Sequence, residues 1–445
     1  WKDALFFFFF EKENTLALLN LQFPEYSELL RRTEPISLEE IQKNLRKDEA
    51  LVEYLLSNKT VTEGRRLYIF IISRNNLFFH ESFLDSLFTL SFEIIEQSLH
   101  GNHLPRNNVP GYSEYTGALH YMYQSLVKPV ESFLTGNRLI LIPDEEIACL
   151  PFDAFLKNPP PEPHMGFEGL DYLVKSYSFS YGYSSSLVFN KKKPGLKNLE
   201  VMAFSPVYRG TGDSGTLDYD SLKGAGLEIR SIFKYFKGRE FSGDQATESN
   251  FSKISQTYSG IHLAMHSVPD SANQKYSCLV FDAKHDTPED GFLYDYEISL
   301  SRTHSQMVVL SACNTGTGVL FHGEGLMSIS RAFILAGASC VVKTLWDVND
   351  DAGSEIISSF YYYLSKGKEK DEALRLAKLK YLEESPPAFK NPALWAAYQV
   401  MGDASAVAVN KKSRMLSILA LLILSGSLVY YVSYSRRRSL REGSR

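Results

Sequence analysis

Short, continuously apolar segments alternate with amphipathic segments through the second half of this chain, and this alternation constrains the fold more than any other feature. Four apolar segments have the length of buried strands: VMAFSP (201–206), GIHLAMHS (260–267), SQMVVLSAC (305–313) and SCVVKTLW (339–346). Helical patterns lie between them, as in LEIRSIFKYF (227–236) and GEGLMSISRAFILAGA (323–338). Apolar strands joined by helices are typical of a parallel sheet with both faces covered. We therefore expect an α/β fold with a doubly wound, mostly parallel sheet and helices on both faces.

The first half carries the same pattern in a weaker form. Strands are predicted at ALVEYLL (50–56), RLYIFIIS (66–73), RLILIP (138–143) and YLVKSYSFSYG (172–182), and helices at 82–100 and 117–134. Ser37 precedes Glu40 by three residues, which is the spacing of a capping box and predicts a helix over 35–46. Residues 1–32 also have a helical pattern, which we interpret as the end of a helical repeat array, although one copy cannot establish a repeat.

Composition excludes several classes of protein. Hydrophobic residues make up 44% and charged residues 22% of the 445 residues, which is globular usage and excludes global disorder. The net charge of −5 gives no reason to expect a nucleic-acid partner. The four cysteines (149, 278, 313 and 340) are far apart, so they form neither a disulfide framework nor a cysteine-rich zinc site. We expect no metal and no cofactor.

One uncharged segment near the end has the length of a membrane span. Residues 415–435 contain no charged side chain, and clusters of Lys and Arg precede and follow them. At about 1.5 Å per residue such a helix crosses a bilayer core, and the flanking cations favour this over a buried core helix. We predict a linker over 404–414, a transmembrane helix over 415–435 in contact with membrane lipid, and a basic tail over 436–445. The flanking charges leave the side of the main domain open.

Two predicted strands end on side chains that can carry chemistry. GIHLAMHS ends near His266, and VVLSACNTG contains Cys313, which lies 47 positions further along. A cysteine nucleophile needs a nearby base, and a His about 50 residues before the Cys is the order found in caspases. The glycines after Cys313 would allow a tight turn that exposes the sulfur and directs backbone N–H groups at an oxyanion. The alternative is that Cys313 is one more buried apolar side chain.

Other assignments for these residues are weaker. His262 and His266 have the spacing of a helical zinc pair, but on a strand they would stand about 13 Å apart at about 3.3 Å per residue, too far to share an ion. Cys149, Cys278 and Cys340 have no His-bearing strand end beside them in sequence, so we predict that they belong to the core. The glycines of GTGVLFHGEG do not match a phosphate-binding loop.

Several sequence blocks together resemble one family. HLAMHS, DGFLYDYEIS, VVLSACNTGTG and GEGLMSISRAFILAGASCVVKTLWDVND strongly resemble the CHAT family, which comprises caspase-like cysteine proteases that often follow tetratricopeptide repeats. The resemblance spans about residues 36–403, with an N-terminal half at 36–195 and a catalytic half at 196–403, behind a helical segment at 1–35. It implies a caspase-like fold and a protein or peptide substrate. It also implies a possible regulatory protein that acts through upstream repeats.

The resemblance also implies roles for individual residues. His266 matches the family's base and Cys313 its nucleophile, with the backbone N–H groups of Cys313 and Ser267 as the oxyanion hole. The family usually has Gly where this chain has Ser267. The substitution keeps the N–H group but is strained if the backbone needs a positive φ. The alternative is an inactive, protease-like scaffold at the membrane.

Four further acidic residues are candidates for supporting roles. We expect Glu324 to support the site geometry at the start of a helix after the catalytic turn. Asp347 and Asp350, followed by Asp351, come after a strand end where substrate pockets form in this fold class, and they would favour a basic residue before the cleaved bond. The alternative is a solvated acidic loop that caps the next helix.

Overall fold

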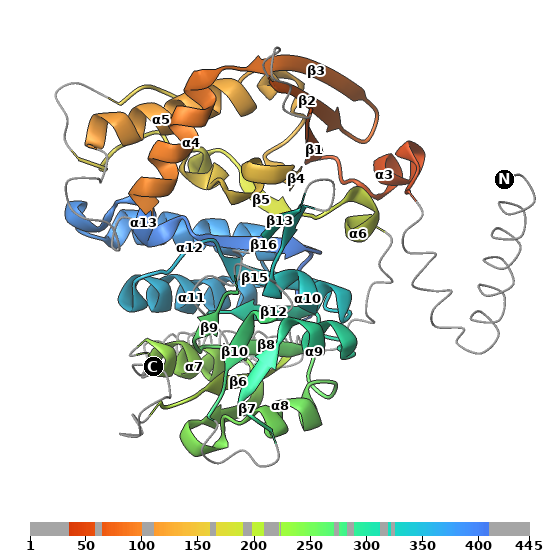
Figure 1. The fold of residues 1–445 in the computed structure, drawn as a ribbon, viewed down its shortest axis with the longest axis vertical. Coiled ribbons are helices and arrows are strands. Elements are labelled where there is room, and N and C mark those ends of the chain that lie inside the picture. The colour runs from red at the N-terminus through yellow and green to blue at the C-terminus, as the bar shows by residue number, and fades with distance from the viewer. Residues whose placement is uncertain are drawn as a thin grey trace, which may run out of the picture.

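A single large mixed sheet runs through the part of the chain that the structure describes (Figure 1). The structure is a computed structural model that describes residues 35–57, 65–99, 111–160, 166–189, 198–208, 222, 224–270, 276–282, 289–311, 319–321 and 325–408. Across the sheet the strands are β3 (Leu77–Leu84), β2 (Arg65–Ile72), β1 (Glu49–Leu56), β4 (Arg138–Ile142), β5 (Ser178–Tyr181), β16 (Tyr398–Gly402), β15 (Cys340–Thr344), β12 (Met307–Leu310), β8 (Gly260–Leu263), β6 (Glu200–Ser205) and β7 (Lys237–Ser242). Two small sheets accompany it, β9 (Ser267–Val268) with β10 (Cys278–Val280) and β11 (Phe292–Tyr294), and β13 (Val319–Phe321) with β14 (Gly325–Met327).

The sheet consists of two halves that meet at one short seam. Strands β6, β7, β8, β12 and β15 run parallel, and β1, β4 and β5 form a second parallel set. Strand β16 joins them, antiparallel to β15 but parallel to β5, with a single register pair, Met401 with Tyr181, at the seam. The two parallel sets therefore point in opposite directions, so their carboxyl ends lie at opposite edges. The sheet is mostly parallel, as the sequence predicts.

Helices cover both faces of this sheet. Figure 1 shows α7, α11 and α12 on one side of the C-terminal half and α8, α9 and α10 on the other. The helices are α3 (Leu38–Asn44), α4 (Ser86–Leu99), α5 (Tyr112–Leu126), α6 (Ser185–Phe189), α7 (Ala225–Tyr235), α8 (Glu248–Ile254), α9 (Asp295–Leu300), α10 (Ile329–Leu335), α11 (Asp350–Ser365), α12 (Lys370–Glu384) and α13 (Pro392–Trp395). Short 3₁₀ turns include η4 (Glu145–Cys149), η5 (Phe152–Ala154), η6 (Leu173–Lys175) and η9 (Pro387–Phe389).

Four predicted elements differ from the structure. The helix predicted over 117–134 is α5, which begins earlier, at Tyr112, and ends at Leu126. The helix predicted over 323–338 is wrong in its first part, because the chain forms β14 there and α10 begins only at Ile329. Glycine disfavours helix, and β14 instead pairs with β13 in a hairpin. The helix predicted over 82–100 begins at Ser86, since the residues before it complete the edge strand β3. In the strand predicted over 172–182, only Ser178–Tyr181 is extended.

The N-terminal capping prediction is confirmed at its central contact. The hydroxyl of Ser37 accepts a hydrogen bond from the N–H of Glu40 at 3.2 Å, and α3 follows directly. The predictions for residues 1–32 and 415–435 lie outside the described residues and remain predictions. Among the helices that the structure describes, none combines the length and the apolar character needed to span a bilayer.

Helix α12 connects the two halves of the sheet through buried charges. Asp371 accepts hydrogen bonds from Ser178 Oγ at 3.0 Å and from Arg138 Nη2 at 2.7 Å, both in the N-terminal half. Lys378 Nζ lies 2.9 Å from Asp153 Oδ2 and donates to the carbonyl of Tyr398 at 2.7 Å. Only 1% of the Lys378 side chain and 7% of the Asp153 side chain are exposed. Burial raises the pKa of Asp153 and lowers that of Lys378, so each depends on the other to stay charged.

We predict that Lys378→Met lowers the free energy of unfolding by about 3–5 kcal/mol, because it leaves a buried carboxylate without its cation. Urea denaturation measures this as a fall in the transition midpoint. The matched control is Lys380→Met, since Lys380 forms an exposed pair with Glu384 on the same helix and should cost at most about 0.5 kcal/mol. Equal midpoints for the two variants would contradict the account.

The same variant should show a characteristic pH dependence. With its cation removed, Asp153 has a folded-state pKa above the ordinary carboxyl value of about 3.9, because burial raises it. The folded state then binds the proton more tightly than the unfolded state. Stability of Lys378→Met relative to the parent should therefore rise as pH falls toward that ordinary value.

Candidate functional site

The carboxyl ends of β8 and β12 lie side by side at one edge of the sheet. Leu263 pairs with Leu310, and the N–H of Ser311 donates to the carbonyl of Leu263 at 3.0 Å. His266 follows Leu263 by three residues, and Cys313 follows Leu310 by three. The parallel register therefore directs both segments toward the same level of the same edge. Cys313 itself lies outside the described residues, as does Glu324.

The backbone of His266 is held by two neighbours. Its N–H donates to Tyr208 Oη at 3.1 Å, and its carbonyl accepts from the N–H of Val280 at 2.9 Å. Tyr208 Oη in turn donates to the carbonyl of Val280 at 2.7 Å, and its ring centroid lies 5.0 Å from that of His266. These contacts fix the loop after β8 against β10, while the His266 side chain stays half-buried.

Ser267 lies in extended backbone. It is the first residue of β9 and pairs with Leu279 of β10. Among the described residues other than glycine, Glu145 alone has a positive φ. Because L-residues adopt extended backbone without penalty, serine fits here without strain. The departure from the family's usual glycine thus does not distort this position.

A buried polar network lies beneath the ends of β8 and β12. Ser311 Oγ donates to Glu228 Oε1 at 2.9 Å. The second carboxylate oxygen of Glu228 lies 3.0 Å from His262 Nε2, within ion-pairing distance though without hydrogen-bond geometry. Glu228 of α7 is only 5% exposed and His262 is fully buried. A single side chain of α7 thus contacts both strands that lead to the candidate dyad.

The far side of His262 meets a tyrosine. Tyr361 Oη of α11 lies 3.3 Å from His262 Nδ1. Burial raises the pKa of Tyr361 well above its ordinary value, so the phenol keeps its proton and can donate to Nδ1. His262 is therefore engaged with Glu228 and Tyr361, in surroundings different from those of His266.

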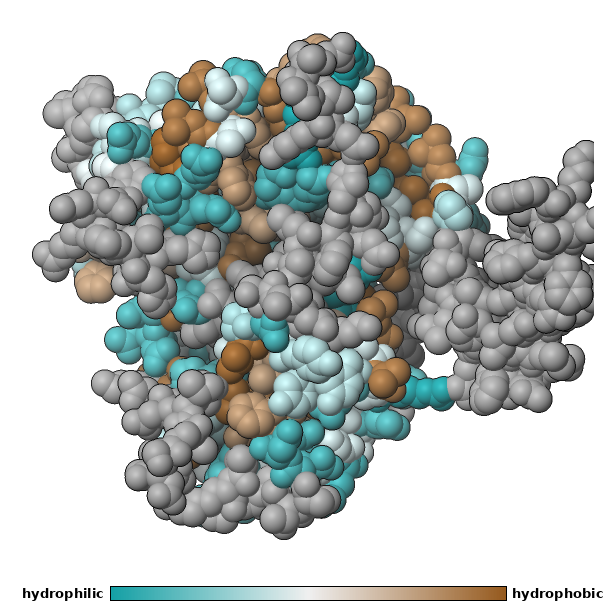
Figure 2. Space-filling model, in the orientation of Figure 1, coloured by the Kyte–Doolittle hydropathy of each residue, from teal (hydrophilic) through white to brown (hydrophobic). Residues whose placement is uncertain are grey.

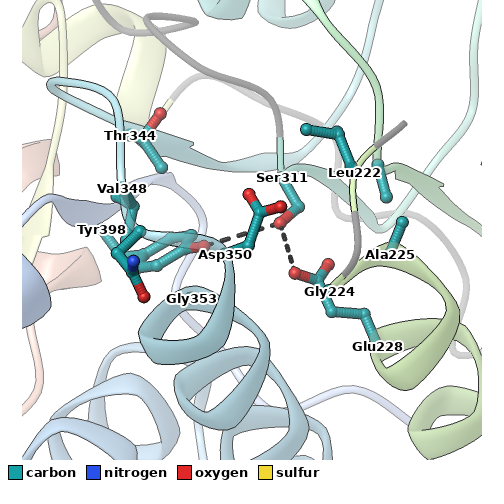
Figure 3. A pocket seen from close by; sticks show the side chains of 12 residues that line it. Leu222, Gly224, Ala225, Glu228, Ser311, Thr344, Val348, Asp350, Gly353 and Tyr398 are labelled. Carbon is teal, nitrogen blue, oxygen red and sulfur yellow. Dashed lines mark hydrogen bonds between the residues drawn. The ribbon is translucent and has the colours of Figure 1, made fainter. Parts of the chain in front are cut away.

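A small acidic cavity adjoins this network. Its volume is about 30 Å³, and Figure 3 shows Glu228, Ser311, Asp350 and Tyr398 around it, with the Asp350 carboxylate directed toward Ser311. The remaining lining residues include Leu222, Gly224, Ala225, Ala264, Thr344, Val348, Asn349 and Gly353. This volume holds about one or two waters. Two carboxylates thus face a cavity at the sheet edge that also carries His266.

The three aspartates predicted to shape a substrate pocket have different environments in the structure. Asp350 lines the cavity, whereas Asp347 is half-buried after β15 and is not among the lining residues, and Asp351 is exposed. The capping alternative also has support, because the Asn349 side chain accepts from the N–H groups of Asp351 and Ala352 and places both aspartates in the first turn of α11. Helix capping and cavity lining are compatible.

The prediction that the other cysteines belong to the core holds for two of the three. Cys278 and Cys340 are buried, as predicted, and Cys149 is half-buried. Burial raises the pKa of Cys149 and of Cys278 to about 11, the opposite of what a thiolate nucleophile needs. Within the described ranges, no three His, Cys, Asp or Glu side chains are placed to share a metal ion.

Sequence reasoning missed Glu228, Ser311, Tyr361 and Tyr398. The available signals were weak: Glu228 is a charged residue in a helix that is otherwise amphipathic, and Ser311 stands two positions before the candidate nucleophile. Tyr361 and Tyr398 come from α11 and β16, and their positions beside the network depend on the sheet order.

Known proteins and protein families show which family this chain is similar to. A family model described as the CHAT domain matches residues 116–403, well over half of the chain. Tetratricopeptide repeat protein 28 of Mus musculus is 33% identical over 115 residues, covering 26% of this chain and 4% of that protein. Its Homo sapiens counterpart is 36% identical over 93 residues, covering 21% and 4%. The chain thus spans only a small part of these relatives.

Two solved structures show a distant similarity to this chain. The Arg specific cysteine proteinase gingipain R gives a TM-score of 0.41 at 9% identity, over 72% of this chain and 74% of that chain. The Saccharomyces cerevisiae separase–securin complex gives a TM-score of 0.47 at 10% identity, over 81% and 30%. The match over residues 116–403, together with the mixed α/β sheet, places this chain in the CHAT domain family.

Proposed function

We propose that this chain is a caspase-like cysteine endopeptidase in which His266 and Cys313 form a catalytic dyad. The observation that carries the proposal is the parallel register of β8 and β12, which pairs Leu263 with Leu310 and so sends both segments to one sheet edge. The family supplies the expectation of peptidase chemistry.

The proposed reaction has two stages. His266 takes the thiol proton, the Cys313 sulfur attacks the scissile carbonyl, and the backbone N–H groups of Ser267 and Cys313 stabilise the oxyanion. The leaving amine receives the proton from His266, and an acyl-enzyme remains. Water, deprotonated by His266, then attacks the thioester and releases the acid product and the free thiol. The extended backbone at Ser267 supports an active site over an inactive scaffold, because the substitution from glycine introduces no strain.

Glu228 supports this site from below. It accepts a hydrogen bond from Ser311 and contacts His262, and these two residues belong to the segments that lead to Cys313 and His266. A buried carboxylate held in this way fixes the spacing of the strand ends, which acyl transfer requires to within fractions of an ångström. We assign Glu228 a positioning role, since its contacts are with other side chains.

We predict that Cys313→Ala abolishes cleavage of a fluorogenic peptide library, while the thermal unfolding midpoint changes little. The matched control is Cys149→Ala, which removes a thiol whose pKa is raised by burial and should leave the cleavage rate within about twofold of the parent. Full cleavage by Cys313→Ala would overturn the assignment of the nucleophile.

Specificity for a basic residue before the cleaved bond is the second part of the proposal. Asp350 and Glu228 line the acidic cavity beside Ser311, and Ser311 lies two residues before Cys313. A carboxylate in a poorly solvated site favours a guanidinium or ammonium side chain. Widening of this small cavity on substrate binding is part of the proposal.

We predict that Asp350→Asn lowers kcat/KM for Arg- and Lys-containing substrates by about 10- to 100-fold, the value of one charged hydrogen bond. Asp351→Asn is the matched control, because Asp351 is exposed in the same first turn of α11 and does not line the cavity. Equal rates for the two variants, or a parent enzyme that prefers Asp or Leu at this position, would refute the pocket.

Membrane attachment through residues 415–435 and regulation by a protein that binds upstream repeats remain part of the proposal on sequence grounds. We predict that the full chain floats with liposomes and that a chain ending at residue 413 does not. Flotation of both chains, or of neither, would contradict the anchor.

A further inference from the structure

An apolar surface lies on the outer face of strands β1–β3. In an antiparallel sheet, directly paired residues share a face, and the register aligns Leu55 with Tyr68, Phe70 with Phe79, and Arg66 with Phe83. Figure 2 shows apolar surface at the upper right, over these strands. We call this surface the outer-face patch; its members are Leu55, Tyr68, Phe70, Leu77, Phe79 and Phe83.

The patch is unusually exposed for large apolar side chains. Leu55, Leu77, Phe79 and Phe83 are each between 48% and 60% exposed. Phe79 contacts Tyr68 and Phe70, with ring centroids 6.1 and 5.2 Å apart, so these three rings form one contiguous surface. The Phe83 ring lies against Arg66, which pairs with Glu81 on the same face. Contiguous apolar surface of this kind marks an interaction site. Strand β3 is also the outermost strand of the sheet, so one side of it has no neighbouring strand in the sheet. Outermost strands of this kind are sites where other segments or chains associate.

Helix α3 already covers part of the same face. Ile41 and Leu45, of α3 and its C-terminal cap, pack on Leu51 and Ile72 in a small second core. Leu51 and Ile72 are paired with each other, and Ile72 is paired with Leu77 of the patch. The contact made by α3 and the outer-face patch are therefore continuous. The chain before α3 is held nearby, since the N–H of Ile36 donates to Ser186 Oγ of α6 at 3.0 Å.

We propose that residues 1–34 of this chain dock on the outer-face patch and extend the cover that α3 begins. This segment carries the apolar run Phe6–Phe10 and a second apolar group at Leu16, Leu18, Leu19 and Leu21. As a helix it would be about 50 Å long at about 1.5 Å per residue, enough to cross three strands spaced about 4.8 Å apart. The docking does not depend on the peptidase chemistry.

The connection through α3 favours this occupant over a second copy of the chain. A segment joined by a short linker meets its site at an effective concentration in the millimolar range. A second molecule reaches such levels only at millimolar protein. The attached segment therefore occupies the patch first, and its occupancy is independent of protein concentration.

Hydrogen exchange on the full chain tests this directly, with a Phe79→Thr/Phe83→Thr variant. Threonine keeps the strand propensity of β3 while removing both rings. In the parent we expect slow exchange over residues 5–21 that is unchanged by a tenfold dilution. In the variant we expect protection of this segment to fall at least about tenfold, or about 1.4 kcal/mol of local opening free energy, while β1 and β2 stay protected. Phe389→Thr is the matched control, because Phe389 is 55% exposed on η9, away from the patch.

Three outcomes would overturn the proposal: fast exchange over residues 5–21 in the parent, protection that the double substitution leaves unchanged, and protection lost on dilution, which would indicate a second copy. A photo-cross-linking phenylalanine at position 79 provides a second measurement if the double variant fails to fold. Cross-links from position 79 to residues 1–34 of the same molecule, and none from position 389, support docking. Their absence at position 79 contradicts it.

Discussion

The parallel pairing of β8 with β12 is the constraint on which the candidate site depends. One register, set by Leu263 opposite Leu310 and by the Ser311 N–H donating to the Leu263 carbonyl, determines where two loops leave the sheet. A shift of one residue in this register would exchange the faces of every side chain on the strand. Glu228 contacts Ser311 and His262 in the observed register, and it could not contact both after such a shift. Backbone pairing and the buried polar network therefore specify the same arrangement.

The two halves of the sheet have different roles. The C-terminal half carries the edge with His266, the acidic cavity and the Glu228 network, whereas the parallel strands β4 and β5 of the N-terminal half end at the opposite edge. The backbone seam between the halves is only one register pair long. The two halves also share one hydrophobic core, and α12 adds Asp371 and the buried Lys378–Asp153 pair to this connection. Apolar packing and buried charges that are stable only as pairs therefore both contribute to holding the halves together.

The sequence predicts the sheet class and the strands that lead to His266 and Cys313, because continuously apolar segments such as VVL in β12 have few alternatives to burial. It does not predict β16, which comes from the far end of the domain and separates β5 from β15. It also fails for the glycine-rich stretch before α10, where hairpin pairing with β13 replaces helix. Glu228 could not be identified, since a single charged residue in an amphipathic helix gives no sign that the fold buries it. Such positions depend on tertiary contacts that local patterns do not encode.

The pairing of His266 with Cys313 is tested most directly by the pH dependence of alkylation of Cys313 with iodoacetamide, followed by peptide mass spectrometry. If the imidazole holds the thiol proton, the titration midpoint in the parent lies below the ordinary cysteine pKa of about 8.5 and rises in His266→Ala. Cys149 and Cys278, whose pKa values burial raises to about 11, provide internal references that the substitution should not affect. Identical profiles for Cys313 in the parent and in His266→Ala would contradict a dyad at the ends of β8 and β12.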